Sequence, residues 1–156
     1  GRSIPVIAAG GIFTGGDIRR FLQIGASGVQ MATRFVATEE CDADKGFKEA
    51  YVHCRKEDIG IIDSPVGLPG RVIMNDFVRD IKAGEKTPYN CPYHCISTCK
   101  QGKSPYCIAA ALINAYNGRL RNGFAFIGAN GYRVDRIVTV SELFRTLEQE
   151  YENESS

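Results

Sequence analysis

The apolar positions near the start of the chain follow the order strand, helix, strand. Residues 4–9 (Ile-Pro-Val-Ile-Ala-Ala) are mostly apolar and lack the in-and-out alternation of a half-exposed strand, which predicts a parallel strand covered on both faces. The next element is marked as a helix by Thr14 as N-cap, Asp17 in a capping-box position and Gly25 at its end. A second short strand is predicted over residues 28–31. Two strands joined by one helix form a βαβ unit, so the sequence predicts an α/β fold with a parallel sheet.

Helical spacing of apolar residues dominates much of the remaining chain. Further helices are predicted over residues 43–54, 72–81 and 141–151, a short strand over 59–62 and a loop over 65–70. No internal repeat of fixed period is present.

The composition changes between Gly84 and Pro105. Pro, Gly, Lys, Asn and Cys replace the periodic apolar residues, which indicates a loop or a small subdomain. Ser104 as N-cap and Pro105 in the first turn then predict another helix, closed by Gly118.

Overall composition fits one globular domain and gives no sign of a charged partner. The chain has 156 residues, of which 44% are hydrophobic and 24% charged, so disorder and collagen-like repeats are excluded. With 19 basic and 18 acidic residues the net charge is +1, which favours neither nucleic acid nor an anionic membrane surface as a partner. No apolar run approaches the roughly 20 residues that span a bilayer. We therefore expect a cytoplasmic protein whose partners have to be inferred from its binding sites.

Two loops that follow the predicted strands have the character of a phosphate site. Gly10 and Gly11 stand where the first strand ends, and glycines let backbone N–H groups approach an anion closely. Ala32 and the Thr33 hydroxyl follow the second strand, and residues 33–37 are long enough for a short extra helix. In (β/α)8 barrels, phosphate binds at the loops after the last two strands together with such a helix. The alternative is a tight turn at the glycines and a simple helix cap at Thr33.

Four of the six cysteines are close together in the sequence. Cys91, Cys95, Cys99 and Cys107 have the spacing C-x3-C-x3-C-x7-C. If residues 92–99 were helical, the first three thiols would share one face, and the fourth would lie in the first turn of the next helix, where the dipole favours a thiolate. Four thiolates suit an iron–sulfur cluster or Zn²⁺. Buried free thiols or an occasional disulfide remain the alternative.

Two stretches of the sequence resemble a known family. Residues 4–12 and 25–40 resemble the last two strands of nitronate monooxygenases, formerly called 2-nitropropane dioxygenases, and are also similar to flavin-dependent enoyl-acyl-carrier-protein reductases. Residues 65–72, 91–95 and 128–134 carry a thinner similarity to later parts of the family. The resemblance implies an FMN-binding (β/α)8 TIM barrel and an oxidoreductase.

The resemblance also implies which part of such a barrel the chain represents. A complete barrel takes about 250 residues. We therefore expect a C-terminal portion, with the last two βα units in residues 1–83 and a Cys-containing, helical extension in residues 84–156. The chain begins at Gly1, one step before a predicted strand. A second chain could complete the barrel, and an isolated form would expose strand edges and apolar helix faces.

The family resemblance assigns the flavin phosphate to the two loops. The residues implied as cofactor-binding are Gly10, Gly11, Gln30, Met31, Ala32 and Thr33. Family members usually carry glycine at the position of Ala32, where alanine keeps the N–H but adds a methyl group. The catalytic histidine of the family has no match: His53 is expected at the surface of a helix and His94 lies among the cysteines. The chain by itself is therefore expected to be inactive.

Other assignments stay open at this level. Inosine monophosphate dehydrogenases are similar around Gly10 and Gly11, so a phosphate-binding TIM barrel without flavin is one alternative. A metal-held interaction module is another. Arg34 is either a charge partner of the phosphate or an ion-pair residue, and Arg71 is equally ambiguous.

Overall fold

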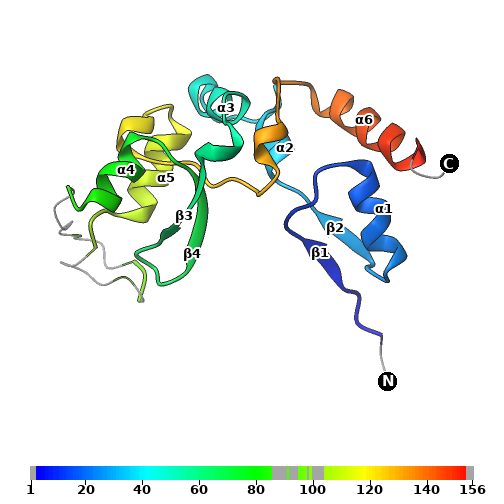
Figure 1. Ribbon diagram of the computed structural model, residues 1–156, viewed down its shortest axis with the longest axis horizontal. Coiled ribbons are helices and arrows are strands. Elements are labelled where there is room, and N and C mark those ends of the chain that lie inside the picture. Colours follow the sequence, from blue (N-terminus) through cyan, green and yellow to red (C-terminus); the bar gives the residue numbers. More distant parts are fainter. Residues whose placement is uncertain (1–2, 86–90, 92–94, 98, 100–103, 154–156) are drawn as a thin grey trace.

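The computed structural model describes residues 3–85, 91, 95–97, 99 and 104–153, whose elements form two groups that lie side by side (Figure 1). The first group, called here the parallel lobe, contains β1 (Ile7–Ala9), α1 (Gly15–Gln23), β2 (Gly28–Gln30) and the C-terminal helix α6 (Val140–Asn153). Strands β1 and β2 pair in parallel across α1, which confirms the predicted βαβ unit. Helix α6 packs along α1.

The second group, called the hairpin lobe, is built on an antiparallel pair of strands. These are β3 (Ile59–Asp63) and β4 (Pro69–Ile73), and helices α4 (Asp76–Ala83) and α5 (Ile108–Tyr116) pack beside them. The shorter elements are α2 (Thr33–Val36), α3 (Lys45–Val52) and the 3-10 turns Lys56–Asp58, Leu120–Asn122 and Gly131–Arg133. In the described part of the chain, every helix is too short or too polar to cross a lipid bilayer.

The hairpin corrects one sequence prediction. The loop predicted over residues 65–70 and the helix predicted over 72–81 overlap β4, and the helix begins only at residue 76. A turn at Gly67, with φ 86°, sends the chain back along β3. Asn75, whose side chain accepts a hydrogen bond from Val78 N at 3.1 Å, starts the helix. The apolar residues of β4 thus have strand partners that lie before them in the chain, which helical spacing could not reveal.

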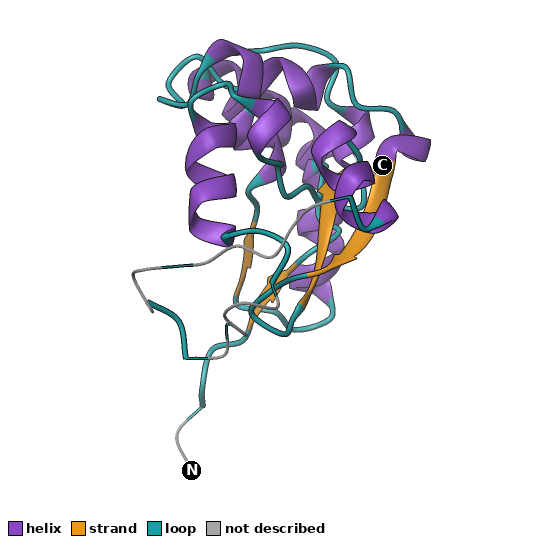
Figure 2. Cartoon of the chain, turned by 90° about the vertical axis from the view of Figure 1, so that its left-hand side faces the viewer, coloured by secondary structure: helices purple, strands orange, loops and turns teal. Residues whose placement is uncertain are grey.

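The predicted burial of the first strand on both faces is also wrong for this chain. Ile4 is 81% exposed, Val6 65% and Ile7 55%. Residues 3–5 extend away from the other elements (Figures 1 and 2). Among the described residues the parallel sheet has two strands only.

Two buried clusters form the core. The cluster between the lobes contains Phe13, Ala37, Tyr51, Cys54, Ala125, Ile127 and Val134. The cluster inside the hairpin lobe contains Ile62, Val72, Phe77, Val78, Tyr106, Ala111 and Phe124. Residues on either side of position 83 contribute to both clusters, so the two predicted segments pack together while their boundary stays a prediction.

Close approach of α1 and α6 depends on a glycine. A Cβ atom at Gly15 would overlap the backbone atoms Leu147 O and Tyr151 N. The Gly15 N–H donates to the Glu150 carboxylate at 2.8 Å. Glycine at the first position of α1 therefore lets the two helix backbones touch.

We expect Gly15→Ala to destabilise the parallel lobe. Because the added methyl meets backbone atoms that cannot rotate away, the loss should be about 1–3 kcal/mol, the usual cost of overpacking. Urea unfolding followed by circular dichroism measures it. The control is Gly28→Ala, where a Cβ would meet only the movable Cδ1 of Ile7 at 3.2 Å. Equal losses in the two variants would contradict the close helix contact.

Candidate functional site

A cavity of about 320 Å³ opens where the two parallel strands end. Its lining includes all six residues that the sequence predicted for a phosphate site, namely Gly10, Gly11, Gln30, Met31, Ala32 and Thr33. Because β1 and β2 run in parallel, the loops that follow them meet at the same edge of the sheet. The structure thus brings the predicted residues together, and phosphate binding there stays a prediction. We call this space the phosphate cup.

Gly10 and Gly11 form the first wall of the phosphate cup. Their φ angles are 88° and 73°, in the left-handed region that residues with a Cβ rarely adopt. A Cβ built on either residue meets no atom within 4 Å. The backbone conformation therefore requires glycine, and the space beside it is open to a ligand.

The second wall is the loop between β2 and α2. Helix α2 begins at Thr33, which confirms the short extra helix predicted over residues 33–37. Ala32 precedes it with φ −129°, outside the left-handed region that favours glycine. The Thr33 hydroxyl oxygen accepts a hydrogen bond from Gly128 N at 3.0 Å. Its own proton remains available for a ligand, because a hydroxyl both donates and accepts.

The third wall of the phosphate cup consists of residues 128–131, which the sequence did not predict as part of the site. Asn130 donates from Nδ2 to the Gly11 carbonyl oxygen at 2.7 Å, which joins this wall to the first. A Cβ at Gly131 would overlap the Ile127 side chain. The sequence signal for this loop is the pair of glycines that flank Ala129 and Asn130, because glycines mark loops and turns, as at Gly10 and Gly11.

Strand pairing positions the third wall. The segment before it lies antiparallel to β4, with an isolated bridge between Val72 and Phe126. Ile127 N donates to Arg71 O, and Ile73 N donates to Ala125 O, each at 3.0 Å. The hairpin lobe therefore holds residues 128–131 against the ends of the parallel strands.

The phosphate cup contains no ionisable side chain among its described lining residues. Its polar groups are backbone amides and the side chains of Gln30, Thr33 and Asn130. An anion bound there would be held by neutral N–H and O–H dipoles, as at other backbone-lined anion sites.

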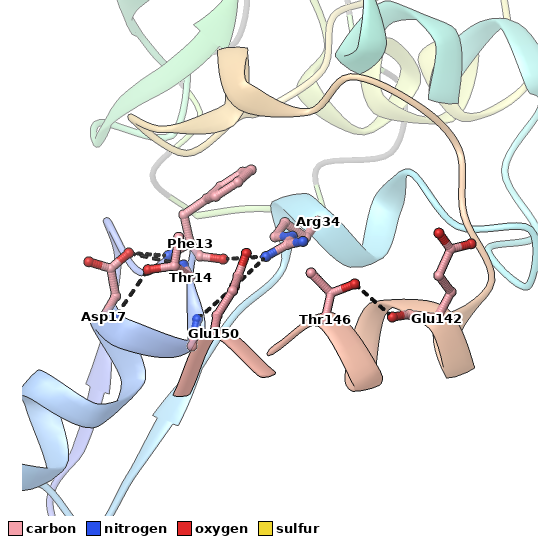
Figure 3. A network of polar contacts seen from close by, with 8 residues as sticks. Phe13, Thr14, Asp17, Arg34, Glu142, Thr146 and Glu150 are labelled. Carbon is pink, nitrogen blue, oxygen red and sulfur yellow. Dashed lines mark hydrogen bonds and ion pairs between the residues drawn. The ribbon is translucent and has the colours of Figure 1, made fainter. Parts of the chain in front are cut away.

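Arg34 is an ion-pair residue beside the phosphate cup. Its Nη1 lies 3.2 Å from Glu150 Oε2 and donates to the Phe13 carbonyl oxygen at 2.9 Å (Figure 3). Its guanidinium also stacks over the Phe13 ring, 4.9 Å from the centroid. The residue does not line the cup. Of the two interpretations, the ion pair therefore holds, and the Arg71 side chain is exposed on β4.

The predicted capping box fixes the chain between the first wall and α1. The Asp17 carboxylate accepts from Phe13 N at 2.9 Å and Thr14 N at 3.0 Å, and the Thr14 hydroxyl accepts from Asp17 N at 3.1 Å (Figure 3). Burial alone would raise the pKa of Asp17, but these hydrogen bonds and the charge of Arg20 outweigh burial and lower that pKa. The carboxylate is therefore favoured in the folded state.

His53 has the surface role that the sequence predicted. It follows α3, is exposed, and its Nδ1 lies 2.9 Å from Glu49 O. His94 lies outside the described residues. Among the residues that the structure describes, no histidine lines the phosphate cup.

The four clustered cysteines line a second, smaller cavity. Cys91, Cys95, Cys99 and Cys107 surround a space of about 20 Å³. Within the described ranges, no three His, Cys, Asp or Glu side chains are close enough to hold one metal ion. A metal site there stays a prediction.

The route by which these cysteines converge differs from the expected one. The described positions between residues 92 and 99 are loop or turn, which corrects the predicted helical face. Cys107 is the N-cap residue of α5, so it lies just before the first turn. Ser104 is buried upstream, and it is not the N-cap that the sequence predicted. The loop ends at the helix start, and this brings the thiols together.

Comparison with known proteins identifies relatives of this chain. The family model described as nitronate monooxygenase matches residues 2–150. A probable nitronate monooxygenase of Staphylococcus haemolyticus (strain JCSC1435) is 42% identical over 89 residues, which cover 56% of this chain and 25% of that protein. A (3aS,4S,5R,7aS)-5-hydroxy-7a-methyl-1-oxo-octahydro-1H-indene-4-carboxyl-CoA dehydrogenase of Mycobacterium tuberculosis (strain ATCC 25618 / H37Rv) is 34% identical over 86 residues, covering 55% of this chain and 23% of that protein.

Solved structures with the same arrangement include FabK from Thermotoga maritima. Its TM-score is 0.77 at 28% identity, with 99% of this chain and 46% of that chain covered. Nitroalkane oxidase from Streptomyces ansochromogenes has a TM-score of 0.69 at 26% identity, with 97% and 40% covered. The chain thus spans less than half of these structures and about a quarter of the curated relatives.

We expect the stability given by Asp17 to depend on pH. Because the folded-state pKa is lowered, the carboxylate stabilises the fold above its unfolded pKa of about 4. That contribution is lost as the pH falls through the folded value. At pH 7, Asp17→Asn should be less stable than the parent by about 1 kcal/mol, a typical loss for a helix cap.

Urea unfolding of both proteins between pH 7 and pH 3 measures this difference. The gap between them should shrink towards the acid end. A gap that stays constant over this range would contradict the capping role. The control is Asp76→Asn, which removes a first-turn carboxylate of α4 that is bonded to the Arg79 side chain on the surface.

Proposed function

The chain belongs to the nitronate monooxygenase family, and on that premise we propose that it supplies the flavin phosphate site of an FMN-dependent oxidoreductase. The observation that carries this proposal is the phosphate cup, where three glycine-containing or strand-end loops meet around one cavity. The residues that would hold the phosphate are Gly10, Gly11, Gln30, Met31, Ala32 and Thr33. Residues 128–131 would close the third side.

The chemistry of the lining of the phosphate cup supports its proposed role at the phosphate end of FMN. Gly10 and Gly11 leave the main chain open to a ligand, because no Cβ stands between the backbone and the cavity. Neutral donors can hold a dianion without the desolvation of a buried lysine or arginine. The Thr33 hydroxyl adds a donor whose position is fixed by Gly128 N.

This chain would hold and orient the bound FMN. FMN, when bound, supplies the transfer of electrons between a small-molecule substrate and an electron acceptor. The capping box at Asp17 and the Arg34–Glu150 ion pair keep the loops of the phosphate cup in place. No described residue of the cup is a general acid or base, so proton transfer requires residues outside it.

We propose different structural roles for the two predicted segments of the chain. Residues 1–83 would provide the last two βα units of a (β/α)8 barrel. Residues 84–156 would form an extension that returns to the cup through its third wall and through Glu150. The barrel strands that contact the flavin ring would come from more of the same polypeptide or from a second chain. By itself, the chain would be inactive, and the protein would work in the cytoplasm.

The names of the relatives refer to different substrates but to one class of reaction, oxidation and reduction. The printed names of relatives include a nitronate monooxygenase, a nitroalkane oxidase and a dehydrogenase of a CoA ester. All three are oxidoreductases by name. We propose a small-molecule substrate that FMN oxidises or reduces, with a nitronate as the first compound to assay.

The natural full-length protein should bind FMN more tightly than riboflavin, because the phosphate cup recognises the phosphate that riboflavin lacks. Gly11→Asp would place a carboxylate beside that phosphate, in a left-handed conformation that Asp tolerates better than most residues. The affinity for FMN should fall at least about tenfold, which is 1.4 kcal/mol. Riboflavin affinity should change by less than about twofold, since no charge is repelled. Flavin fluorescence titration measures both.

A matched control separates charge repulsion from backbone strain. Gly67→Asp places the same residue at φ 86° in the β3–β4 turn, outside the phosphate cup, and should leave FMN affinity unchanged. Equal binding of FMN and riboflavin by the parent protein would overturn the assignment of the cup. Binding of inorganic phosphate without either flavin would favour the barrel without flavin.

A further inference from the structure

The cysteines of this chain are sorted by position in the fold. The four clustered ones line the small cavity beside α5, called here the cysteine cavity. The other two lie elsewhere: Cys54 is buried in the cluster between the lobes, and Cys41 precedes α3. The cysteine cavity shares no described residue with the phosphate cup. Any role for it is therefore separate from flavin binding.

The walls between the thiols are apolar. Ile96, Ile108 and Ala109 line the cavity together with the cysteines. Aliphatic residues are otherwise almost absent here, since Ile96 is the one Leu, Ile, Val or Met between Gly84 and Pro105. So few apolar side chains give little hydrophobic stabilisation at about 25 cal/mol per Å². Another interaction is needed to fix the described cysteines beside α5.

Two hydroxyl groups lie at the cavity. Ser104 Oγ is 3.7 Å from Cys99 Sγ. Tyr106 is 5% exposed, and its hydroxyl has no hydrogen-bond partner among the described residues. A buried donor without an acceptor is costly, and metal-bound sulfur is an acceptor that such a group can satisfy.

Cys107 lies at the start of a helix. It is the N-cap residue of α5, a nine-residue helix, and its side chain makes no capping hydrogen bond. The other thiols come from the preceding loop, and Cys91 is buried among them. Four cysteine sulfurs around one space are the donor set that a thiophilic metal centre takes.

The thiols surround the cavity without yet forming a closed ligand set. As they stand, no three described ligand side chains are close enough for one ion. A space of about 20 Å³ exceeds the roughly 10–15 Å³ that a single water needs. Metal sites of this kind assemble when the ligands close around the metal, so the free energy of metal binding adds to the stability of the fold.

We propose that Cys91, Cys95, Cys99 and Cys107 bind a thiophilic metal centre, either Zn²⁺ or an iron–sulfur cluster, that fixes the preceding loop to the start of α5. Both centres take four thiolates. The role is structural, since the cavity is separate from the phosphate cup.

The test is metal analysis of the natural full-length protein after anaerobic purification. We expect about one zinc per chain without sulfide, or about two to four iron with an equal amount of acid-labile sulfide. Either result supports the proposal, and the sulfide assay distinguishes the two centres. Absence of both metals, with all thiols alkylated or with a disulfide between two of these cysteines, would overturn it.

Variants identify the ligands. Cys107→Ser and Cys95→Ser should each lower bound metal at least about tenfold, and the second keeps packing intact because Cys95 is exposed. Cys41→Ser is the matched control and should keep full metal. An equal loss in the control, or full metal in both cavity variants, would contradict the ligand set.

Stability and flavin content give independent readouts. Removal of the metal with a chelator should lower the melting temperature of the parent protein and leave that of Cys107→Ser unchanged. FMN content should be the same in the parent and in both cavity variants. Unchanged melting of the parent after metal removal would overturn the structural role without affecting the proposed flavin site.

Discussion

The carboxylate of Glu150 joins three elements on which the phosphate cup depends. It accepts the N–H of Gly15 at the start of α1 and pairs with Arg34 of α2, while its own backbone belongs to α6 (Figure 3). Arg34 in turn donates to the Phe13 carbonyl, just after the first wall of the cup. The pair is largely sheltered, with 16% of the Arg34 side chain and 32% of the Glu150 side chain exposed. Such charge-assisted hydrogen bonds are stronger than those of a fully exposed pair.

This interaction explains why the cup itself can remain uncharged. Arg34 is paired with Glu150 and held against Phe13, so it positions the loops and leaves the cavity to neutral donors. Gly15 allows α6 to come close enough for the contact. The C-terminal helix thus supports a site whose walls come from the start and the end of the chain.

The two cavities have different kinds of support. The phosphate cup rests on strand ends and on the pairing of residues 124–127 with β4, both regular backbone interactions. The cysteine cavity is lined mostly by residues that precede α5. One of them, Tyr106, packs against the rings of Phe77 and Phe124. A metal centre is the kind of group that compensates for a small core, because its binding free energy adds directly to folding.

By itself, the sequence determined the βαβ unit, the capping box at Thr14 and Asp17, and the place of Gly10, Gly11, Ala32 and Thr33 in the loops after the two strands. These features depend on local spacing and on the rule that parallel strands end at one edge. Only the tertiary structure decided the third wall at residues 128–131, the ion pair of Arg34, and the strand character of β4. Each of these depends on partners distant in the sequence, and local periodicity carries no information about them. The exposure of Ile4 and Val6 has the same cause, since burial on two faces requires neighbours that a strand's own pattern cannot supply.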